Sequence, residues 1–388
     1  MYRIGIEEIE AVKKVIESKQ LFKVNDGDLQ ETMNAEKELC EKLGAKHALV
    51  MTSGHAAIAS ALIALGIGPG DQVIIPAYTY IATAITVLEA GAIPVIAEID
   101  ESFTIDPEDV EKKITNHTKA IIPVHIKGFP SNMEKICALA KKYGLFVVED
   151  SCQADGASFK GKRLGTWGDA GAYSFNYFKI ISMGEGGALV TDRRDVFENA
   201  LIYHDSSACA YFGNQMQDFT AQPFCGSEYR TNEISAAILR EQLKKLDGII
   251  LDLRKNKKYL MDNLSPFCNF IKSNDIEGDL GTTVGILFDT IDAAEKFGEK
   301  YGVMPTIHTK KHVYSDWKPI LEKRGALNPL MDPFKMEANK DIVPDYKPDM
   351  CPRAIDLLSR VVYVEVNPDW TKEDMDKKIE SVKSALNA

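Results

Sequence analysis

The stretch "AIIPVHIKGFPSNMEKICALAKKYGLFVVEDS", residues 120–151, joins two short apolar runs through an amphipathic segment. The runs at 120–126 and 145–151 are continuous and of strand length, which is typical of strands buried on both faces of a parallel sheet. The segment between them ends at Gly144, and a glycine there fits a helix C-cap. A strand, a helix and a second strand in this order predict a parallel sheet covered by helices.

The same alternation extends along most of the chain and predicts an α/β fold. Further strands are expected at "HALVMT", "QVIIPAY", "IPVIAEID", "GAYS" and "ALVTD", which makes a mostly parallel, seven-stranded sheet in a large domain. A helix from about Asp195, an irregular polar stretch up to Gly226 and a long helix over 232–264 follow. The strands "TTVGILFD" and "RVVYVEV" and the closing helix "KEDMDKKIESVKSAL" predict a smaller C-terminal α/β domain. We place the domains at 1–246, with an N-terminal helix, and 247–388.

Composition and charge narrow the class of protein. The 388 residues suffice for two domains, and the net charge of −11 argues against a nucleic-acid partner, which usually needs a concentrated basic surface. The seven cysteines include no CxxC pair, so neither a disulfide framework nor a zinc site is indicated, and no metal is expected. No segment reads as a signal peptide or a membrane span. These features predict a cytoplasmic protein.

Two groups of unusual residues follow strands in the first half of the chain. "TSGHAA", residues 52–57, places a glycine at the start of a helix, where backbone N–H groups bind anions; a plain strand-to-helix turn is the alternative. "PAYTY" places Tyr78 and Tyr80 after the next strand, either as core aromatics or as a platform for a flat ring. Since ligands bind at the carboxyl ends of parallel strands, both positions are candidate contacts.

Two more groups follow later strands. Glu149 and Asp150 end an apolar strand, where a carboxylate is costly unless it is paired with a neighbour or faces a cationic ligand atom. In "SFNYFKIISMGEGGALVTD", residues 174–192, Ser174 ends a strand and Lys179 is the one basic residue. A lysine there either extends along the surface or is held in a pocket, where desolvation makes an amine a usable nucleophile.

Together these groups supply an anion site, an aromatic platform, a strand-end carboxylate and a lysine. Pyridoxal 5′-phosphate (PLP) needs this set: a phosphate site, a ring stack, a partner for the pyridinium nitrogen and a Schiff-base lysine. The order of the groups and their common position after strands favour a PLP site over four unrelated features.

Three blocks of the sequence resemble the DegT/DnrJ/EryC1/StrS family of sugar aminotransferases. "SFNYFKIISMGEGG" resembles the family's S-F-x-x-x-K-x-x-x-x-G-E-G-G motif, and "VVEDSCQADG" resembles V-x-E-D-x-x-Q-A-x-G. "TSGHAAIASALIALGIGPGDQVIIP" resembles the S-G-T-A-A-L block and the G-P-G-D segment after it. The resemblance implies PLP as cofactor, the fold type I of PLP-dependent transferases, and a homodimer with shared active sites.

The resemblance also implies roles for individual residues. Lys179 would form the Schiff base and carry protons, and Asp150 would keep the pyridine nitrogen protonated. Gln153 would contact the phenolic oxygen and Tyr80 would stack on the ring. The phosphate would bind Ser174 and the backbone of Gly54, His55 and Ala56.

Several positions depart from the family pattern. His55 stands where the family usually has threonine, so an imidazole could replace a hydroxyl at the phosphate. Glu228, in "GSEYR", replaces an asparagine that reaches the neighbouring subunit's phosphate, and we expect it to turn away or to pair with Arg230 or His55. Lys127 and Phe129 replace a tyrosine and a glutamine near the acceptor. His308 is a candidate substrate contact, followed by the basic residues Lys310, Lys311 and His312.

The sequence therefore predicts an aminotransferase that moves an amino group from glutamate or glutamine to a keto or aldehyde group. The acceptor is expected to be sugar-derived and anionic: a nucleotide sugar, an acidic sugar or a small phosphoketone. One alternative is a sugar dehydratase that uses pyridoxamine phosphate, although such relatives carry histidine where Lys179 stands. The other is a non-catalytic protein of this fold, a sensor or structural partner, which His55 and Glu228 leave open.

Overall fold

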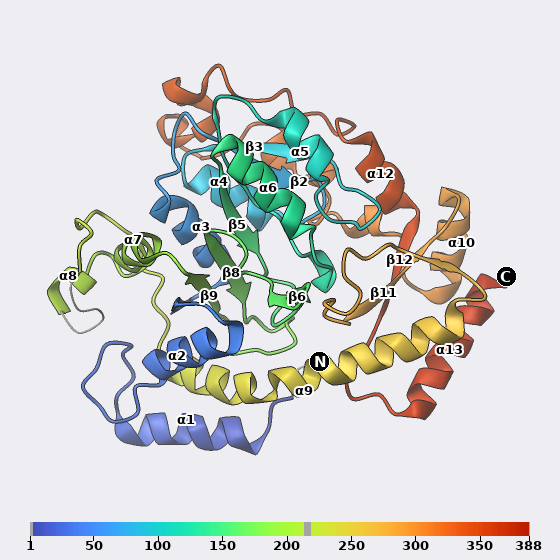
Figure 1. The fold of residues 1–388 in the computed structure, drawn as a ribbon, viewed down its shortest axis with the longest axis horizontal. Coiled ribbons are helices and arrows are strands. Elements are labelled where there is room, and N and C mark those ends of the chain that lie inside the picture. The colour runs from blue at the N-terminus through green and yellow to red at the C-terminus, as the bar shows by residue number, and fades with distance from the viewer. Residues whose placement is uncertain (1–2, 213–218, 388) are drawn as a thin grey trace.

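A seven-stranded sheet lies at the centre of the structure, a computed structural model that describes residues 3–212 and 219–387 (Figure 1). The strand order is β1-β9-β8-β5-β4-β2-β3, and every neighbouring pair is parallel except the two pairs that β9 makes, so the predicted mostly parallel sheet is confirmed. Its strands are β1 (His47–Met51), β2 (Gln72–Pro76), β3 (Ile93–Ala97), β4 (Thr118–Ile121), β5 (Phe146–Asp150), β8 (Ala170–Ser174) and β9 (Gly187–Thr191).

The strands are apolar on both faces because helices cover both faces of the sheet. In β1, Leu49 and Met51 belong to one hydrophobic core, whereas Ala48 and Val50 belong to the other. The first core contains residues of α3 (Gly54–Ala64), α4 (Ala82–Glu89) and α7 (Arg194–His204). The second contains residues of α2 (Glu31–Leu43), α5 (Pro107–Lys113), α6 (Met133–Tyr143) and α9 (Glu233–Leu264).

The predicted long helix is α9, which begins after the N-cap Asn232 and runs without interruption to Leu264. It packs against α1 (Ile6–Ser18) and α2 in the large domain and against α13 (Lys372–Leu386) near the C-terminus (Figure 1). The domain boundary that we predict at residues 246/247 falls inside this helix. The remaining short elements of the large domain are α8 (Cys209–Phe212), β6 (Ser158–Phe159) and β7 (Lys162–Arg163). Of the irregular stretch predicted up to Gly226, residues 213–218 lie outside the described part.

The C-terminal part contains a three-stranded antiparallel sheet with the order β10-β11-β12. Its strands are β10 (Asn269–Phe270), β11 (Thr283–Leu287) and β12 (Val361–Glu365), and its helices are α10 (Ile291–Tyr301), α12 (Pro352–Ser359) and α13. The two strands and the closing helix predicted here are confirmed.

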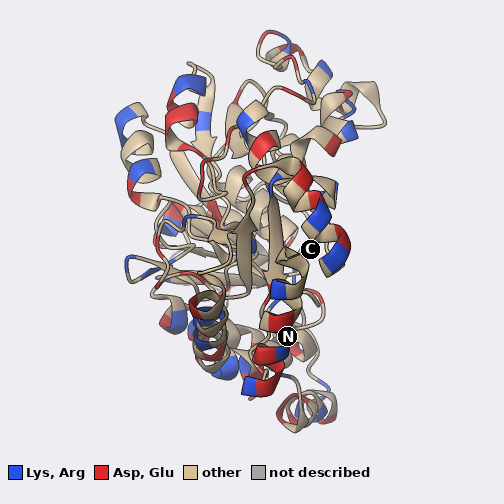
Figure 2. Cartoon of the chain, turned by 90° about the vertical axis from the view of Figure 1, so that its right-hand side faces the viewer, with Lys and Arg blue, Asp and Glu red and all other residues tan. Residues whose placement is uncertain are grey.

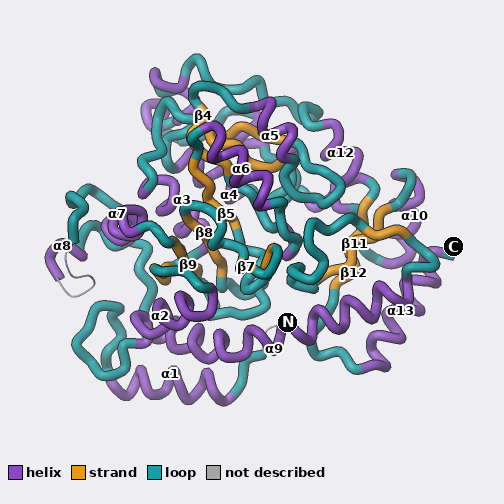
Figure 3. Tube along the Cα trace, viewed as in Figure 1, coloured by secondary structure: helices purple, strands orange, loops and turns teal. Residues whose placement is uncertain are grey.

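Residues 302–351 connect α10 to α12 mainly through loops and short helical turns, including α11 (Lys318–Leu321), as Figure 3 shows. Tyr314 and Trp317 of this segment are fully buried in the same core as Leu49 and Met51 of β1. The segment therefore packs on the large domain although it lies late in the chain, and it brings Lys311 and His312 toward the central sheet.

Charged residues lie mainly on the outer helices and loops. Figure 2 shows lysine and arginine interleaved with aspartate and glutamate along these helices, whereas the central strands carry few charges. Within residues 3–212 and 219–387, none of the helices combines the length and apolar character that a bilayer span requires. None of the seven cysteines, all of which lie in the described part of the chain, forms a disulfide.

Candidate active site

A cavity of about 500 Å³ opens at the carboxyl ends of the central strands, where the sheet faces the smaller C-terminal sheet. Ligands of open α/β sheets bind at this edge. The sequence-predicted residues that line the cavity are Gly54, His55, Tyr80, Lys127, Asp150, Gln153, Ser174 and Lys179. Residues more than a hundred positions apart in sequence thus meet in one place.

The N-terminus of α3 lies in the wall of the cavity. Ser53 is the N-cap, and its hydroxyl accepts a hydrogen bond of 3.0 Å from the N–H of Ala56. The Ala56 N–H is therefore already used, and Ala56 does not line the cavity. A Cβ on Gly54 would lie 2.5 Å from the sulfur of Cys152 and 3.0 Å from Cβ of Ser174, so only glycine fits between these side chains. The result is a tight cradle of backbone and hydroxyl groups that suits an anion.

His55 follows Gly54, and its side chain contacts a glutamate of α4. Its Nε2 lies 2.5 Å from a carboxylate oxygen of Glu89 in α4, and the hydroxyl of Tyr229 donates to the same carboxylate. Burial would raise the pKa of Glu89, but the hydrogen bonds from His55 and Tyr229 lower it below its usual value. The imidazole thus joins α3 to α4 and to the loop before α9.

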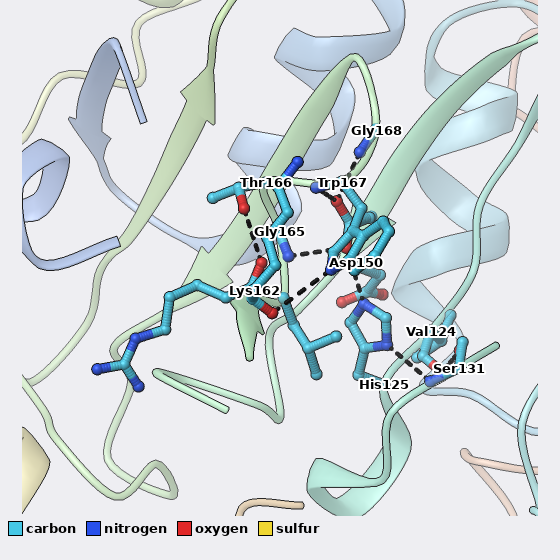
Figure 4. A network of polar contacts seen from close by, with 12 residues as sticks. Val124, His125, Ser131, Asp150, Lys162, Gly165, Thr166, Trp167 and Gly168 are labelled. Atoms are coloured by element: carbon cyan, nitrogen blue, oxygen red, sulfur yellow. Dashed lines mark hydrogen bonds and ion pairs between the residues drawn. The ribbon is translucent and has the colours of Figure 1, made fainter. Parts of the chain in front are cut away.

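Glu149 and Asp150 follow one another in β5 and have different surroundings. The Glu149 carboxylate is fully buried and accepts hydrogen bonds from the backbone N–H groups of Gly165, Trp167 and Gly168, at 2.8, 2.5 and 2.8 Å. His125 Nε2 lies 3.2 Å from the same carboxylate. Figure 4 labels His125, Gly165, Trp167 and Gly168 of this network. Glu149 therefore holds the loop after β7 and does not line the cavity.

The proton of His125 can be assigned from its second nitrogen. Nδ1 accepts a hydrogen bond of 3.1 Å from the N–H of Ser131, so Nε2 carries the hydrogen and donates it to Glu149 (Figure 4). A neutral imidazole thus joins the three backbone N–H groups as a hydrogen-bond donor to the buried Glu149 carboxylate. These hydrogen bonds offset the cost of burying the carboxylate in the core.

Asp150 points into the cavity and is 5% exposed. One carboxylate oxygen accepts a hydrogen bond of 2.8 Å from the hydroxyl of Thr83, and the other accepts one of 3.1 Å from the N–H of Cys152. These two bonds fix the orientation of the carboxylate. A cationic atom in the cavity would meet a buried negative charge there.

Lys179 lies in the loop between β8 and β9 and is partly buried in the cavity wall. The neighbouring Tyr177 and Phe178 are 64% and 79% exposed, whereas Ile180 and Ile181 are buried. The pocket alternative for Lys179 therefore describes its position better than the surface alternative. The glycine turn that follows allows a close approach, because a Cβ on Gly187 would lie 2.3 Å from the backbone carbonyl carbon of Ser53.

The two tyrosines after β2 differ in position. Tyr78 is buried in the core, whereas Tyr80 is 44% exposed and lines the cavity. The Tyr80 ring lies 5.6 Å from the ring of His312, and Lys311 Nζ lies 5.5 Å from its centroid. Tyr80 is therefore the aromatic that can face a bound ring.

Gln153 and Lys127 are connected through the backbone. Gln153 Oε1 accepts a hydrogen bond of 3.0 Å from the N–H of Lys127, so the NH₂ group of Gln153 is left to donate to an oxygen in the cavity. The Lys127 ammonium lies 5.6 Å from the centroid of Tyr363. Burial lowers the pKa of Lys127, and the negative charge of Glu365 opposes this.

Glu228, Arg230 and His308 do not line the cavity in this chain. Glu228 pairs with Arg230 at 2.6 Å, which is one of the two pairings expected for it. His308 is exposed on a helical turn, 4.0 Å from a carboxylate oxygen of Glu295. The structure thus separates these three residues from the cluster around Lys179.

The structure adds cavity residues to which sequence reasoning gave no role. Thr83 orients Asp150, Glu365 reaches the cavity from β12, and Asp155 lies in the wall near Lys179. Asp155 carries a signal in the sequence, since it is an acid among small and apolar residues five positions after Asp150. Thr83 and Glu365 carry none, because their roles depend on tertiary contacts.

The residues present fit PLP. The cradle at Gly54, which a Cβ would fill, suits the phosphate, and Lys179 provides the amine. The buried carboxylate of Asp150 suits a protonated ring nitrogen. Solved structures of the same fold hold pyridoxal or pyridoxamine phosphate.

Comparison with known proteins identifies the family. The model of the DegT/DnrJ/EryC1/StrS aminotransferase family matches residues 3–297. The chain is 30% identical to the spore coat polysaccharide biosynthesis protein SpsC of Bacillus subtilis, over 99% of this chain and 95% of that protein. It is 39% identical to the GDP-perosamine synthase of Caulobacter vibrioides, where the match spans 55% of this chain and only 56% of that protein.

Solved structures agree with this family. The aminotransferase from Psychrobacter cryohalolentis superposes with a TM-score of 0.79 at 26% identity, covering 99% of this chain and 98% of that chain. The predicted fold type I of PLP-dependent transferases is thereby confirmed. The chain belongs to the DegT/DnrJ/EryC1/StrS family and is a PLP-dependent aminotransferase of the kind used in sugar biosynthesis.

Proposed function

We propose that this aminotransferase moves an amino group from glutamate, or from glutamine, to a keto or aldehyde carbon of an anionic, sugar-derived acceptor. The observation that carries the proposal is that Lys179 and Asp150 reach one cavity at the carboxyl ends of the sheet. A nucleophilic amine and a buried carboxylate in the same concave site are the two groups that amino-group transfer with PLP requires.

The other cavity residues have proposed binding roles. Ser174 and the backbone at Gly54 and His55 hold the phosphate, with Ala56 stabilising the turn. Tyr80 stacks on the ring, and the NH₂ group of Gln153 donates to the phenolic oxygen. Asp150 holds a proton on the ring nitrogen, and Thr83 keeps Asp150 in place.

Lys179 is the proposed proton carrier. The bound cofactor supplies an electron sink that makes the proton on the amine-bearing carbon of the substrate acidic. Nζ of Lys179 takes up this proton and returns it at a neighbouring position, because the lysine stem is long and flexible. Burial of the site excludes water from the exchange.

An anionic acceptor is favoured by two lysines of the cavity wall. Lys127 and Lys311 line it, and among the ion pairs of the described residues neither lysine has a carboxylate partner within 4.0 Å. His312 lies near both, and burial together with the charges of Lys127 and Lys311 lowers its pKa to about 4. A neutral imidazole beside two unpaired ammonium groups suits a carboxylate or phosphate. Arg230 and His308 are proposed only as contacts made across a dimer.

We also propose a homodimer with shared active sites. The exposed Tyr177 and Phe178 adjoin Lys179, and Phe178 lines the cavity, so a second subunit would cover apolar surface there.

We retain 1–246 and 247–388 as the two domains. Free cysteines favour a reducing compartment such as the cytoplasm, and the interleaved charges in Figure 2 do not favour a nucleic-acid partner.

Two other functions remain as alternatives to be tested. A sugar dehydratase that uses pyridoxamine phosphate shares this fold, but Lys179 occupies the position where the dehydratases carry histidine. A non-catalytic sensor or structural protein was suggested by His55 and Glu228. Both residues have structural partners of their own, Glu89 and Arg230, so neither unusual residue implies a lost activity.

A substrate screen tests the proposal. The enzyme with PLP and glutamate is mixed with nucleotide keto-sugars, acidic keto-sugars, small phosphoketones and neutral keto-sugars, and release of 2-oxoglutarate is followed. We expect turnover with at least one anionic acceptor and a lower kcat/KM for its neutral counterpart. Equal kcat/KM for charged and neutral acceptors would contradict the anionic class, and water loss without amino transfer would favour the dehydratase.

A further inference from the structure

Asp155 lies in the wall of the cavity on the loop that follows β5, and it is 2% exposed. The backbone of this loop is fixed by the next residue. Gly156 has φ +79°, and a Cβ there would lie 2.8 Å from the Ile250 side chain of α9. The loop thus packs closely against α9 at Gly156, directly after Asp155.

The Asp155 carboxyl group is incompletely satisfied. Its Oδ1 is buried and has no hydrogen-bond partner among the described residues. Buried polar atoms are almost always paired, and an unpaired carboxylate oxygen is costly. A group of this kind in the wall of a ligand cavity indicates that its partner belongs to the working site.

The charges around Asp155 identify the partner. Burial raises the pKa of Asp155 well above its usual range, and the positive charge of Lys179 acts against this rise. The other titratable groups that face Asp155 are the Cys152 thiol and the Tyr173 hydroxyl. Burial raises the pKa of both, so both are neutral at pH 7. Within residues 3–212 and 219–387, Lys179 is therefore the cation whose charge acts on Asp155.

We propose that Asp155 is a positioning residue for Lys179, whose positively charged nitrogen donates a hydrogen bond to the unpartnered carboxylate oxygen. Both side chains line the same cavity. Burial disfavours the charged carboxylate of Asp155, and a positive charge on the Lys179 nitrogen favours it. The inference deepens the proposed function, because it gives the proton-carrying lysine a counter-ion.

A double-mutant cycle on the cofactor-free protein tests the pairing directly. The variants are Asp155→Asn, Lys179→Met and the double variant, and the midpoint of urea unfolding is measured at pH 7. Lys179→Met leaves the carboxyl group without its cation, so we expect it to destabilise wild type more than it destabilises the Asp155→Asn protein. Additive effects would overturn the proposal.

A spectroscopic titration provides a second readout with bound PLP. The pH midpoint of the visible absorbance change of the bound cofactor is compared between wild type and Asp155→Asn. Loss of the counter-ion disfavours the protonated nitrogen, so we expect the midpoint to fall by about one pH unit, a tenfold change in proton affinity. Asp155→Glu should restore part of the shift. An unchanged midpoint in Asp155→Asn would overturn the proposal.

A matched control uses another carboxylate of the same cavity. Glu365 acts on Lys127, and Glu365→Gln should leave the absorbance midpoint in place. If Glu365→Gln shifts the midpoint as much as Asp155→Asn does, the shift reflects the total charge of the cavity. That result would contradict a specific pairing of Asp155 with Lys179. If wild type shows no visible band at all, the proposed function fails, and the urea cycle still decides the pairing of Asp155 with Lys179.

Discussion

Glu149 and Asp150 are consecutive residues of β5 that serve opposite faces of the sheet. Glu149 is enclosed by the backbone of residues 165–168 and by His125, whereas Asp150 opens into the cavity beside Thr83. The period of two in a strand makes this division unavoidable. One carboxylate therefore supports the fold and the other is available for chemistry.

Replacing each carboxylate by its amide should affect stability at Glu149 and activity at Asp150. Glu149→Gln removes the charge that three N–H groups and His125 surround, and we expect a loss of about 2–4 kcal/mol in the free energy of unfolding, since partners are left unpaired. Asp150→Asn should change this free energy by less than about 1 kcal/mol and lower kcat by about 100-fold or more. Urea unfolding and steady-state kinetics measure both effects, and equal stability losses would contradict the division of roles.

Gly54→Ala should weaken PLP binding, because the added methyl group would lie 2.5 Å from the Cys152 sulfur. We expect a rise in the dissociation constant of PLP of about tenfold or more, measured by fluorescence titration. Gly248→Ala is the matched control, since a Cβ at Gly248 in α9 meets nothing within 4 Å. The control should stabilise the protein by about 0.5–1 kcal/mol and leave PLP affinity unchanged.

The Cys152 side chain offers a rescue for the same site. In Gly54→Ala combined with Cys152→Ala, the sulfur that causes the closest clash is absent, so part of the PLP affinity should return. If the double variant binds PLP no better than Gly54→Ala, the steric account of the cradle is wrong.

His204 should make the stability of the fold depend on acid. It is fully buried, its Nδ1 donates 2.8 Å to the carbonyl of Leu201, and its Nε2 lies 3.2 Å from Nζ of Lys23. Burial, and then the charge of Lys23, lowers the pKa of His204 well below its usual value. The unfolded chain takes up this proton first, so stability present above about pH 6.5 is lost as the pH falls.

The expected slope is about 1.4 kcal/mol per pH unit below pH 6.5 for this one group. Other groups titrate in the same range, so the quantity to measure is the difference between wild type and His204→Gln in urea unfolding from pH 7 to pH 5. The variant should lose less stability than wild type over this range. Parallel curves would show that His204 has the same pKa in the folded and unfolded states, and would contradict the account.

Lys127 and Lys311 should govern the choice of acceptor. Lys127→Gln and Lys311→Gln should each lower kcat/KM for an anionic acceptor by about tenfold, since a hydrogen-bonded charge is worth about 1.5–3 kcal/mol, and should leave a neutral acceptor unaffected. The exposed Lys318 lies outside the cavity, and Lys318→Gln is the control. A similar loss for charged and neutral acceptors would indicate a structural role.

The sequence identified what local patterns encode. Apolar runs indicated the seven strands, and Lys179, Asp150 and Gly54 could be proposed as site residues because each lies at or after the end of a strand. The partners of these residues were hidden: Thr83 for Asp150, Glu89 for His55, and the 165–168 loop for Glu149. Such partners are set by packing between distant segments, which no spacing in the chain reports.

The part of the cavity wall formed by residues 302–351 was the hardest to predict from the sequence. Residues 302–351 have weak periodicity, and their short turns are held by the burial of Tyr314 and Trp317 in the core of the large domain. This packing brings Lys311 and His312 to the cavity while His308 stays exposed, although the three residues are close in sequence. Predicting that difference requires the tertiary contact itself.

The most direct measurement of the central claim is the absorbance of the enzyme with PLP before and after glutamate is added. Wild type should show a visible band that is lost with glutamate and returns when 2-oxoglutarate is supplied. Lys179→Ala should show neither change and should keep the thermal midpoint of cofactor-free wild type to within a few degrees. A wild-type spectrum that does not respond to glutamate or glutamine, or a Lys179→Ala protein that turns over at the wild-type rate, would contradict the account.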